Sequence, residues 1–143
     1  MKIIWPTLCQ KETAVGVRGR SKGKGYGTFY AGSGCGQIFR CIVEEGLCEK
    51  FTEEKENEVY TLDIDVTSST LTSGGKDTII RSYDITTKKL LKSYERSLLD
   101  DYKGHNARIF SIRCDPQEQS IFYSGGWDNV VKVSGLAWVH DTS

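Results

Sequence analysis

The chain has 143 residues, of which 38% are hydrophobic and 10% aromatic, with 19 basic and 19 acidic side chains. This length suits one domain or a part of a larger one, and the hydrophobic content excludes a wholly disordered chain. A formal net charge of zero gives the whole chain no argument for binding nucleic acid or a membrane. No apolar run approaches the ~20 residues that span a bilayer, and the start MKIIWPTLC is too short for a signal-peptide core.

The cysteines bear on the cellular compartment. They are odd in number, form no Cys-x-x-Cys pair, and several alternate with residues typical of strands. We therefore expect buried, reduced thiols in an intracellular protein, either cytoplasmic or nuclear. The five are Cys9, Cys35, Cys41, Cys48 and Cys114.

Residues 1–27 form a basic, glycine-rich leader, with six Lys and Arg side chains against one acidic residue, Glu12. Few apolar positions are available for burial, so the segment predicts a flexible leader or a poorly specified strand. The alternative is an electrostatic arm for RNA over residues 18–24, because basic side chains beside glycine and a tyrosine suit phosphate contact and base stacking. The segment does not match a phosphate loop, G-x-x-x-x-G-K-[ST].

From Thr28 onward, short apolar runs alternate with turn residues, which predicts strands. The first segment has a run from residue 28, a glycine turn, a second run over 37–43 and a return over 47–51. Its glycines do not form a dinucleotide loop, since no glycine follows three residues later and no helical period follows the turn. Shifted by 41 positions, YAGSGCGQIFRC lies over LTSGGKDTIIRS, so the segment is a degraded copy of the next one.

Two clearer copies follow. The middle copy, VYTLDIDVTSSTLTSGGKDTIIRSYDI, predicts strands from Val59, over 71–73, over 78–83 and over 90–94. The last copy, entered at Gly104-His105, predicts strands over 109–112, 121–124 and 130–133. No helix is predicted. Short strands in groups that recur every 40–50 residues have the period of propeller blades.

The motifs of these copies resemble the WD40 repeat family. The family's Gly-His is Gly104-His105, its Ser-Gly-x-x-Asp turn recurs at 73–77 and 124–128, and its closing Trp-Asp is approximated by Tyr83-Asp84. The resemblance covers about residues 28–134. It implies an all-β, incomplete WD40-type propeller of about three four-stranded blades, preceded by the basic leader 1–27. The repeats would span about 28–55, 56–103 and 104–143.

The resemblance also implies a structural polar network. In the family a loop histidine donates to the turn aspartate, and a serine or threonine and a tryptophan complete the network. The middle copy has Lys55 where the histidine is expected, and the first copy lacks both histidine and aspartate. Ser134 stands at the tryptophan position of the last copy, which leaves its fourth strand an open question. The implied network residues are His105, Ser124, Asp128, Ser73, Asp77, Tyr83 and Asp84.

Serine, histidine and aspartate also form hydrolase triads. Here no nucleophile elbow is present, and the family uses this trio structurally. With two histidines, His105 and His140, the chain offers no metal-ligand cluster and no convincing paired acid and base. We therefore expect no catalytic residues, no metal and no cofactor.

The function that the resemblance implies is a non-catalytic scaffold for protein–protein interaction, with other proteins as partners. Trp127, Arg18 and Arg20 are candidate contact residues, since tryptophan and arginine are enriched at interface hot spots. An RNA-associated adaptor using residues 18–24 is the alternative, although we expect neither nucleic acid nor a membrane as the main partner.

Closure of the propeller is the remaining question. Closed propellers have at least ~4 blades, and three would leave open faces and exposed strand edges. The chain is therefore expected to be part of a longer protein, an incomplete reading of its gene, or a protomer that self-associates to complete the ring.

Overall fold

The computed structural model describes residues 14–20, 27–65, 67–97 and 104–135, the first of these ranges by its backbone alone. Within these ranges the chain forms eleven strands in three antiparallel sheets and no helix. The all-β fold that the sequence predicts is therefore confirmed.

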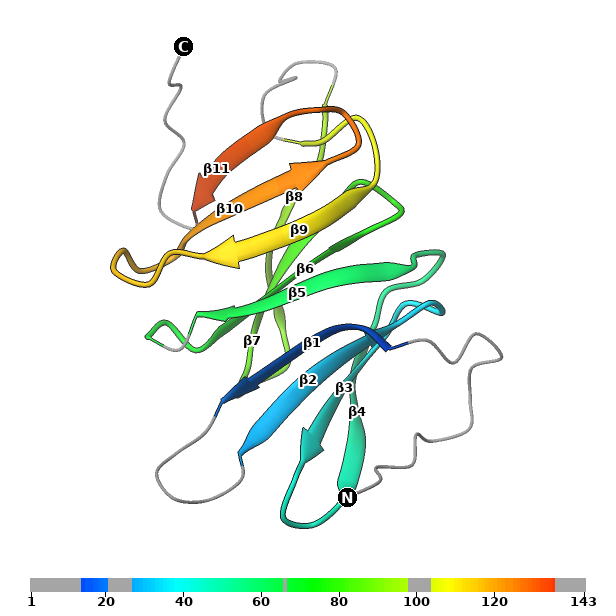
Figure 1. Cartoon of the computed structure of the whole chain (residues 1–143), viewed down its shortest axis with the longest axis vertical. Coiled ribbons are helices and arrows are strands. Elements are labelled where there is room, and N and C mark those ends of the chain that lie inside the picture. The colour runs from blue at the N-terminus through cyan, green and yellow to red at the C-terminus, as the bar shows by residue number, and fades with distance from the viewer. Residues whose placement is uncertain (1–13, 21–26, 66, 98–103, 136–143) are drawn as a thin grey trace.

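Each sheet takes its strands in chain order, and we call the sheets blades 1, 2 and 3. Figure 1 shows them one above another, with their innermost strands β1, β5 and β9 side by side. Blade 1 contains β1 (Ala14–Arg20), β2 (Thr28–Ser33), β3 (Gln37–Ile42) and β4 (Leu47–Glu53). Blade 2 contains β5 (Val59–Asp65), β6 (Thr70–Gly75), β7 (Ile80–Asp84) and β8 (Leu90–Tyr94). Blade 3 contains β9 (Ile109–Cys114), β10 (Ile121–Gly126) and β11 (Val131–Gly135).

Strand β1 lies within the predicted leader, where the sequence left a flexible segment and a poorly specified strand as alternatives, and over residues 14–20 the structure has the strand. Its backbone pairs antiparallel with β2, with Gly16 opposite Gly32 and Arg20 opposite Thr28. Glycine is depleted in strands, and pairing with a neighbouring strand overrides this weak local preference. Blade 1 therefore has four strands among the described residues and begins before residue 28. Residues 1–13 and 21–26 of the predicted leader, and the segment 136–143 that would hold the last blade's fourth strand, lie outside the described residues.

The hydrophobic core lies between the blades. One cluster joins blades 1 and 2, and a second joins blades 2 and 3. Burying one such aliphatic or aromatic side chain contributes about 1.5–3 kcal/mol, so each blade depends on its neighbour for stability. The first cluster contains Tyr30, Ile38, Phe51, Val59, Leu62, Leu71 and Tyr83. The second contains Ile80, Tyr94, Ile109, Ile112 and Phe122.

Polar side chains of β5 also cross to blade 3. Thr61 Oγ1 accepts a hydrogen bond from the backbone N–H of Ile112 at 3.1 Å, and Asp63 Oδ2 accepts one from Cys114 at 2.7 Å. Asp65 Oδ2 accepts from the N–H of Ser120 at 2.9 Å. The innermost strand of blade 3 and the turn after it thus receive hydrogen-bond partners from blade 2, which matters because buried N–H groups without partners are costly.

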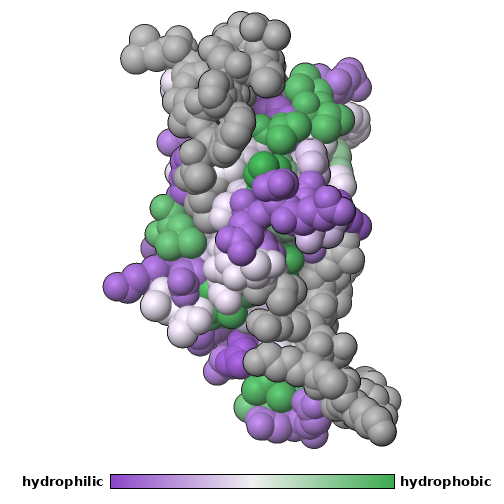
Figure 2. All heavy atoms as spheres, turned by 90° about the vertical axis from the view of Figure 1, so that its left-hand side faces the viewer, coloured by the Kyte–Doolittle hydropathy of each residue, from purple (hydrophilic) through white to green (hydrophobic). Residues whose placement is uncertain are grey.

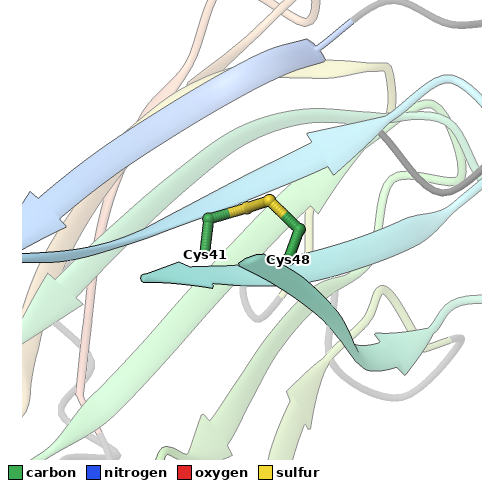
Figure 3. Close-up of a disulfide and its surroundings, with 2 residues drawn as sticks. All are labelled: Cys41 and Cys48. Atoms are coloured by element: carbon green, nitrogen blue, oxygen red, sulfur yellow. A yellow bond between two sulfur atoms is a disulfide. The ribbon is translucent and has the colours of Figure 1, made fainter. Parts of the chain in front are cut away.

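The cysteines differ from the prediction of reduced thiols. Cys41 on β3 and Cys48 on β4 lie directly opposite each other and form a disulfide, with their Cα atoms 4.1 Å apart (Figure 3). Cys35 is also disulfide-bonded, whereas Cys114 keeps its thiol and is half-buried. Cys41 and Cys48 can pair because the β3–β4 register places them opposite each other. The spacing of cysteines along the chain does not reveal that register. The inference of an intracellular location from reduced thiols therefore loses its basis.

Among the described residues, no helix is long and apolar enough to cross a membrane.

Candidate interaction site

A buried hydrogen-bonded trio holds the entrance to blade 3. His105 lies in the loop before β9, and its Nδ1 is 2.9 Å from Asp128 Oδ2 while its Nε2 is 2.8 Å from Ser124 Oγ. The carboxylate can only accept, so Nδ1–H donates to Asp128, while Nε2 forms the second hydrogen bond with the serine hydroxyl. His105 and Ser124 are both buried. The structure thus brings together the three residues that the resemblance implies for the last blade.

Asp128 is held in its ionised form. Burial alone would raise its pKa, but the backbone N–H of Asn106 at 2.9 Å and the side chain of His105 donate to it. Together with the N–H of Val130, these donors hold the pKa of Asp128 below its ordinary value. The carboxylate therefore ties the loop before β9 to the turn between β10 and β11.

In blade 2 the corresponding position is occupied by Glu54, and the assignment of Lys55 to it is wrong. Glu54 precedes Ser73 by 19 residues, as His105 precedes Ser124. Its buried Oε1 accepts hydrogen bonds from Ser73 Oγ and from Tyr83 OH, the latter at 2.9 Å. Lys55, the next residue, is exposed. The 19-residue spacing to the strand serine is the sequence signal that identifies Glu54.

Two further donors complete the Glu54 site. Asn57 Nδ2 donates to Glu54 Oε2 at 2.7 Å, and Arg81 Nη1 lies 3.5 Å from the same oxygen. Arg81 also pairs with Asp77 Oδ2 at 2.7 Å, so Asp77 joins the network through arginine. Burial, and then the charge and hydrogen bond of Glu54, raise the pKa of Tyr83 far above its ordinary value.

Asp84 does not belong to this network. Its Oδ1 accepts from the N–H groups of Thr86 and Thr87, at 2.8 and 2.7 Å, in the turn between β7 and β8. These backbone donors lower the pKa of the Asp84 carboxyl. Among the implied network residues, Asp84 therefore stabilises a separate turn.

An exposed aromatic surface lies beside the His105 trio. Tyr60 on β5 and Phe110 on β9 stack with their ring centroids 5.2 Å apart, and Phe110 meets Trp127 edge-on at 5.6 Å. The Arg108 guanidinium lies 5.7 Å from the Trp127 ring. Trp127 is 64% exposed and Phe110 48% exposed. We call Tyr60, Phe110, Trp127 and Arg108 the aromatic patch.

The aromatic patch is anchored by the fold beneath it. The backbone N–H of Trp127 donates to the backbone carbonyl of Arg108 at 2.8 Å, and Trp127 directly precedes Asp128 of the buried trio. On the other side, Tyr60 OH donates to Glu58 Oε2 at 2.8 Å. The sequence singled out Trp127 alone, because the contacts with Tyr60 and Phe110 depend on the packing of β5 against β9.

Arg18 and Arg20, the other two candidate contact residues, lie on β1 of blade 1. The structure describes only their backbone, and it does not place them in the aromatic patch.

The side of the molecule that carries the β5–β6 and β9–β10 turns has no cluster of exposed apolar side chains comparable to the aromatic patch among the residues drawn in colour. Figure 2 shows this side, where hydrophilic residues surround separate hydrophobic spots and the residues drawn in colour form no continuous apolar area. It therefore offers a weaker candidate surface for holding another protein.

Comparison with known proteins agrees with the propeller architecture. The WD40 family model (WD domain, G-beta repeat) matches residues 46–84 and 96–133, which together are more than half of the chain. No curated protein matches the sequence.

Among solved structures, one chain in a crystal structure of the Mitotic Checkpoint Complex superposes with a TM-score of 0.64 at 14% identity. The match covers 79% of this chain and 32% of that chain, so the present chain spans about a third of its length. This likeness shows the fold, an incomplete WD40-type propeller. The RNA-adaptor alternative finds no support in either comparison.

Proposed function

Because the chain belongs to the WD40 repeat family, we propose that it is a non-catalytic scaffold that binds other proteins through the aromatic patch. The observation that carries the proposal is the exposure of Phe110 and Trp127 in contact with each other. Large aromatic side chains clustered at a surface are typical of interface hot spots, where one or two residues dominate affinity.

The patch also favours a particular kind of partner. Trp127 and Phe110 form an apolar, rigid contact area, and Arg108 beside them supplies one positive charge. A partner segment with an aliphatic or aromatic anchor next to a carboxylate would match both features.

Peptide display against the folded chain tests this proposal. Peptides enriched on the wild type should lose more than tenfold in affinity for Trp127→Ala and for Phe110→Ala. The matched control is Leu90→Ala, which removes an equally exposed apolar side chain on β8, outside the patch. Enriched peptides that bind all variants equally would place the binding surface elsewhere and sink the proposal.

Burial supports the non-catalytic part of the proposal. Ser124, His105 and Asp128 are linked in the order of a hydrolase triad, yet the serine and the imidazole are both buried and hydrogen-bonded to each other. A nucleophile needs access to substrate, so we assign the trio a structural role. A turnover that disappears in a folded Asp128→Asn variant would contradict this assignment.

We also propose a cytoplasmic or nuclear location, as is common for interaction scaffolds; the Cys41–Cys48 disulfide of the structure would then be reduced in the cell. Its test is the redox state of Cys41 and Cys48 in cells, read by alkylation before lysis. Reducing compartments keep thiols reduced, so alkylated thiols would support the proposal and an intact disulfide would overturn it.

A further inference from the structure

Among the described residues, blade 3 leaves uncovered the face that blades 1 and 2 each pack against the innermost strand of the next blade. In blade 1 a side chain added at Gly32 would collide with Val59, the first residue of β5. In blade 2 a Cβ at Gly74 would lie 2.9 Å from Ile109 Cγ2 and 2.8 Å from Ile112 Cδ1. Each glycine therefore leaves room for the innermost strand of the following blade.

Gly125 is the corresponding glycine of blade 3. It follows Ser124 on β10 as Gly74 follows Ser73 on β6. A Cβ built there would meet no atom within 4 Å among the described residues. The close approach for which glycine is used in blades 1 and 2 is thus available in blade 3, but no described strand makes it.

The apolar residue on the strand beside each glycine is buried in blades 1 and 2 and exposed in blade 3. Ile38 lies opposite Gly32 and is 0% exposed, and Ile80, beside Gly74, is 1% exposed. Val131 lies opposite Gly125 and is 76% exposed. Tyr123 and Val133, a cross-strand pair, are also exposed. Blade 3 thus presents an apolar face of the kind that blades 1 and 2 cover with a strand.

We propose that this face binds the innermost strand β1 of a second copy of the chain, so that two copies complete one ring. The occupant follows from the covered faces, each of which takes an innermost strand with two aliphatic residues three apart: Val59 and Leu62 over blade 1, Ile109 and Ile112 over blade 2.

Strand β1 is the innermost strand of blade 1 and shares the features of β5. Both strands have a register shift near their start, between Ala14 and Gly16 in β1 and between Val59 and Thr61 in β5. Counting from the glycine partner, Ala14 and Val17 take the register positions of Val59 and Leu62. Two copies of the three described blades make six, within the range of about 4–8 blades found in closed propellers.

Hydrogen bonding at the new contact would follow the β5–β9 pattern. Thr61, opposite Gly74, accepts from a backbone N–H of the next innermost strand. Ser111, opposite Gly125, holds that register position in blade 3 and is exposed. Its hydroxyl is placed to accept from the backbone of the incoming β1.

The first test is the solution mass of the full chain, measured by light scattering after gel filtration. The wild type should have twice the chain mass of 16.0 kDa. Gly125→Leu fills the vacant space and Val131→Asp charges the face, so each should halve the mass while the far-UV spectrum stays unchanged. The matched control, Leu91→Asp on β8, should remain a dimer, since Leu91 is also an exposed apolar residue, at 50%, but lies off this face.

The second test identifies the strand that docks. Gly125→Cys and Ala14→Cys chains are mixed and oxidised, and a covalent dimer containing one of each is expected. Three outcomes would overturn the proposal. The wild type could stay monomeric at a chain concentration about 100 times a typical micromolar Kd. Alternatively, the dimer could survive both face variants, or it could form without this cross-link.

Discussion

Blades 2 and 3 hold the loop before their innermost strand with different buried side chains. In blade 3 the imidazole of His105 joins Ser124 to the carboxylate of Asp128. In blade 2 the buried carboxylate of Glu54 binds Ser73 directly and reaches Asp77 only through Arg81. Both arrangements fasten the loop before the innermost strand to the second strand of the same blade. The fold therefore requires a hydrogen-bonding side chain at this position, and histidine is one of the residues that can supply it.

The two arrangements differ in how many buried polar groups lose their partner when the central side chain, His105 or Glu54, is removed. Removing His105 leaves the Ser124 hydroxyl without this partner, but the Asp128 carboxylate keeps the backbone N–H groups of Asn106 and Val130 as donors. Removing Glu54 leaves Ser73, Tyr83 and Asn57 without their common acceptor. Unsatisfied buried groups carry the full desolvation cost, so we expect blade 2 to be the more sensitive.

The largest effect is expected for Glu54→Ala. It should lower the free energy of unfolding by about 3 kcal/mol, because several buried donors lose one acceptor together. Urea unfolding followed by circular dichroism measures it. Lys55→Ala is the matched control and should change stability by less than about 0.5 kcal/mol. Equal losses in both variants would contradict the assignment of Glu54 as the counterpart of His105.

The second effect compares equivalent glycines. Gly74→Val should destabilise the chain by about 2 kcal/mol, since the added atoms would press on Ile109 and Ile112. Gly125→Val should leave the folding stability of a single chain almost unchanged, because its Cβ meets open space among the described residues. Thermal unfolding at low concentration, where chains are dissociated, provides the measurement. A large loss for Gly125→Val there would show that blade 3 is covered within one chain.

A smaller loss is expected for His105→Ala, about 1–2 kcal/mol, from an unpaired Ser124 hydroxyl and a weakened Asp128 contact. Hydrogen exchange should show the Asn106 amide losing protection, since this N–H donates to Asp128. His105→Gln, which can still bond one partner, should recover part of the stability. If the two variants behave alike, packing rather than hydrogen bonding holds the loop.

The smallest effect concerns pH. Asp128 has a lowered pKa in the folded chain, so its stabilisation is present above the unfolded pKa of about 3.9. It is lost as the pH falls from that value through the folded pKa. Asp128→Asn should therefore reduce the acid dependence of stability measured between neutral pH and acid. The exposed acid variant Glu45→Gln serves as control and should reproduce the wild-type curve.

Much of this fold could be predicted because its signals are local. The Ser-Gly-Gly turns with aspartate, and the apolar runs around them, identified strands in blades 2 and 3. Strand β1 stayed undecided between a strand and a flexible leader, because its glycines weaken the local signal and its pairing with β2 depends on residues further along the chain. The disulfide was missed for a similar reason, since only the β3–β4 register brings Cys41 opposite Cys48.

The candidate site was predictable in part. His105, Ser124 and Asp128 follow a recognisable motif, and the structure brings them together. Glu54 was not predicted, because a carboxylate replaces the expected imidazole. The alignment of the repeats was off by one residue at this point, so the position was assigned to Lys55. The aromatic patch combines residues of two blades, Tyr60 with Phe110, and no spacing within one repeat indicates that contact.

The hydrogen bonds that β5 side chains accept from the backbone around β9 have a consequence for how the chain unfolds. Because Thr61, Asp63 and Asp65 supply these acceptors, the amide protection of blade 3 depends on an intact blade 2. Stacked repeats behave as a row of coupled units whose stability comes largely from their interfaces. Blade 3 can therefore open first while blades 1 and 2 stay folded. The loss of blade 2 instead removes the support of both neighbours at once, which makes the middle of the chain the cooperative unit of the molecule.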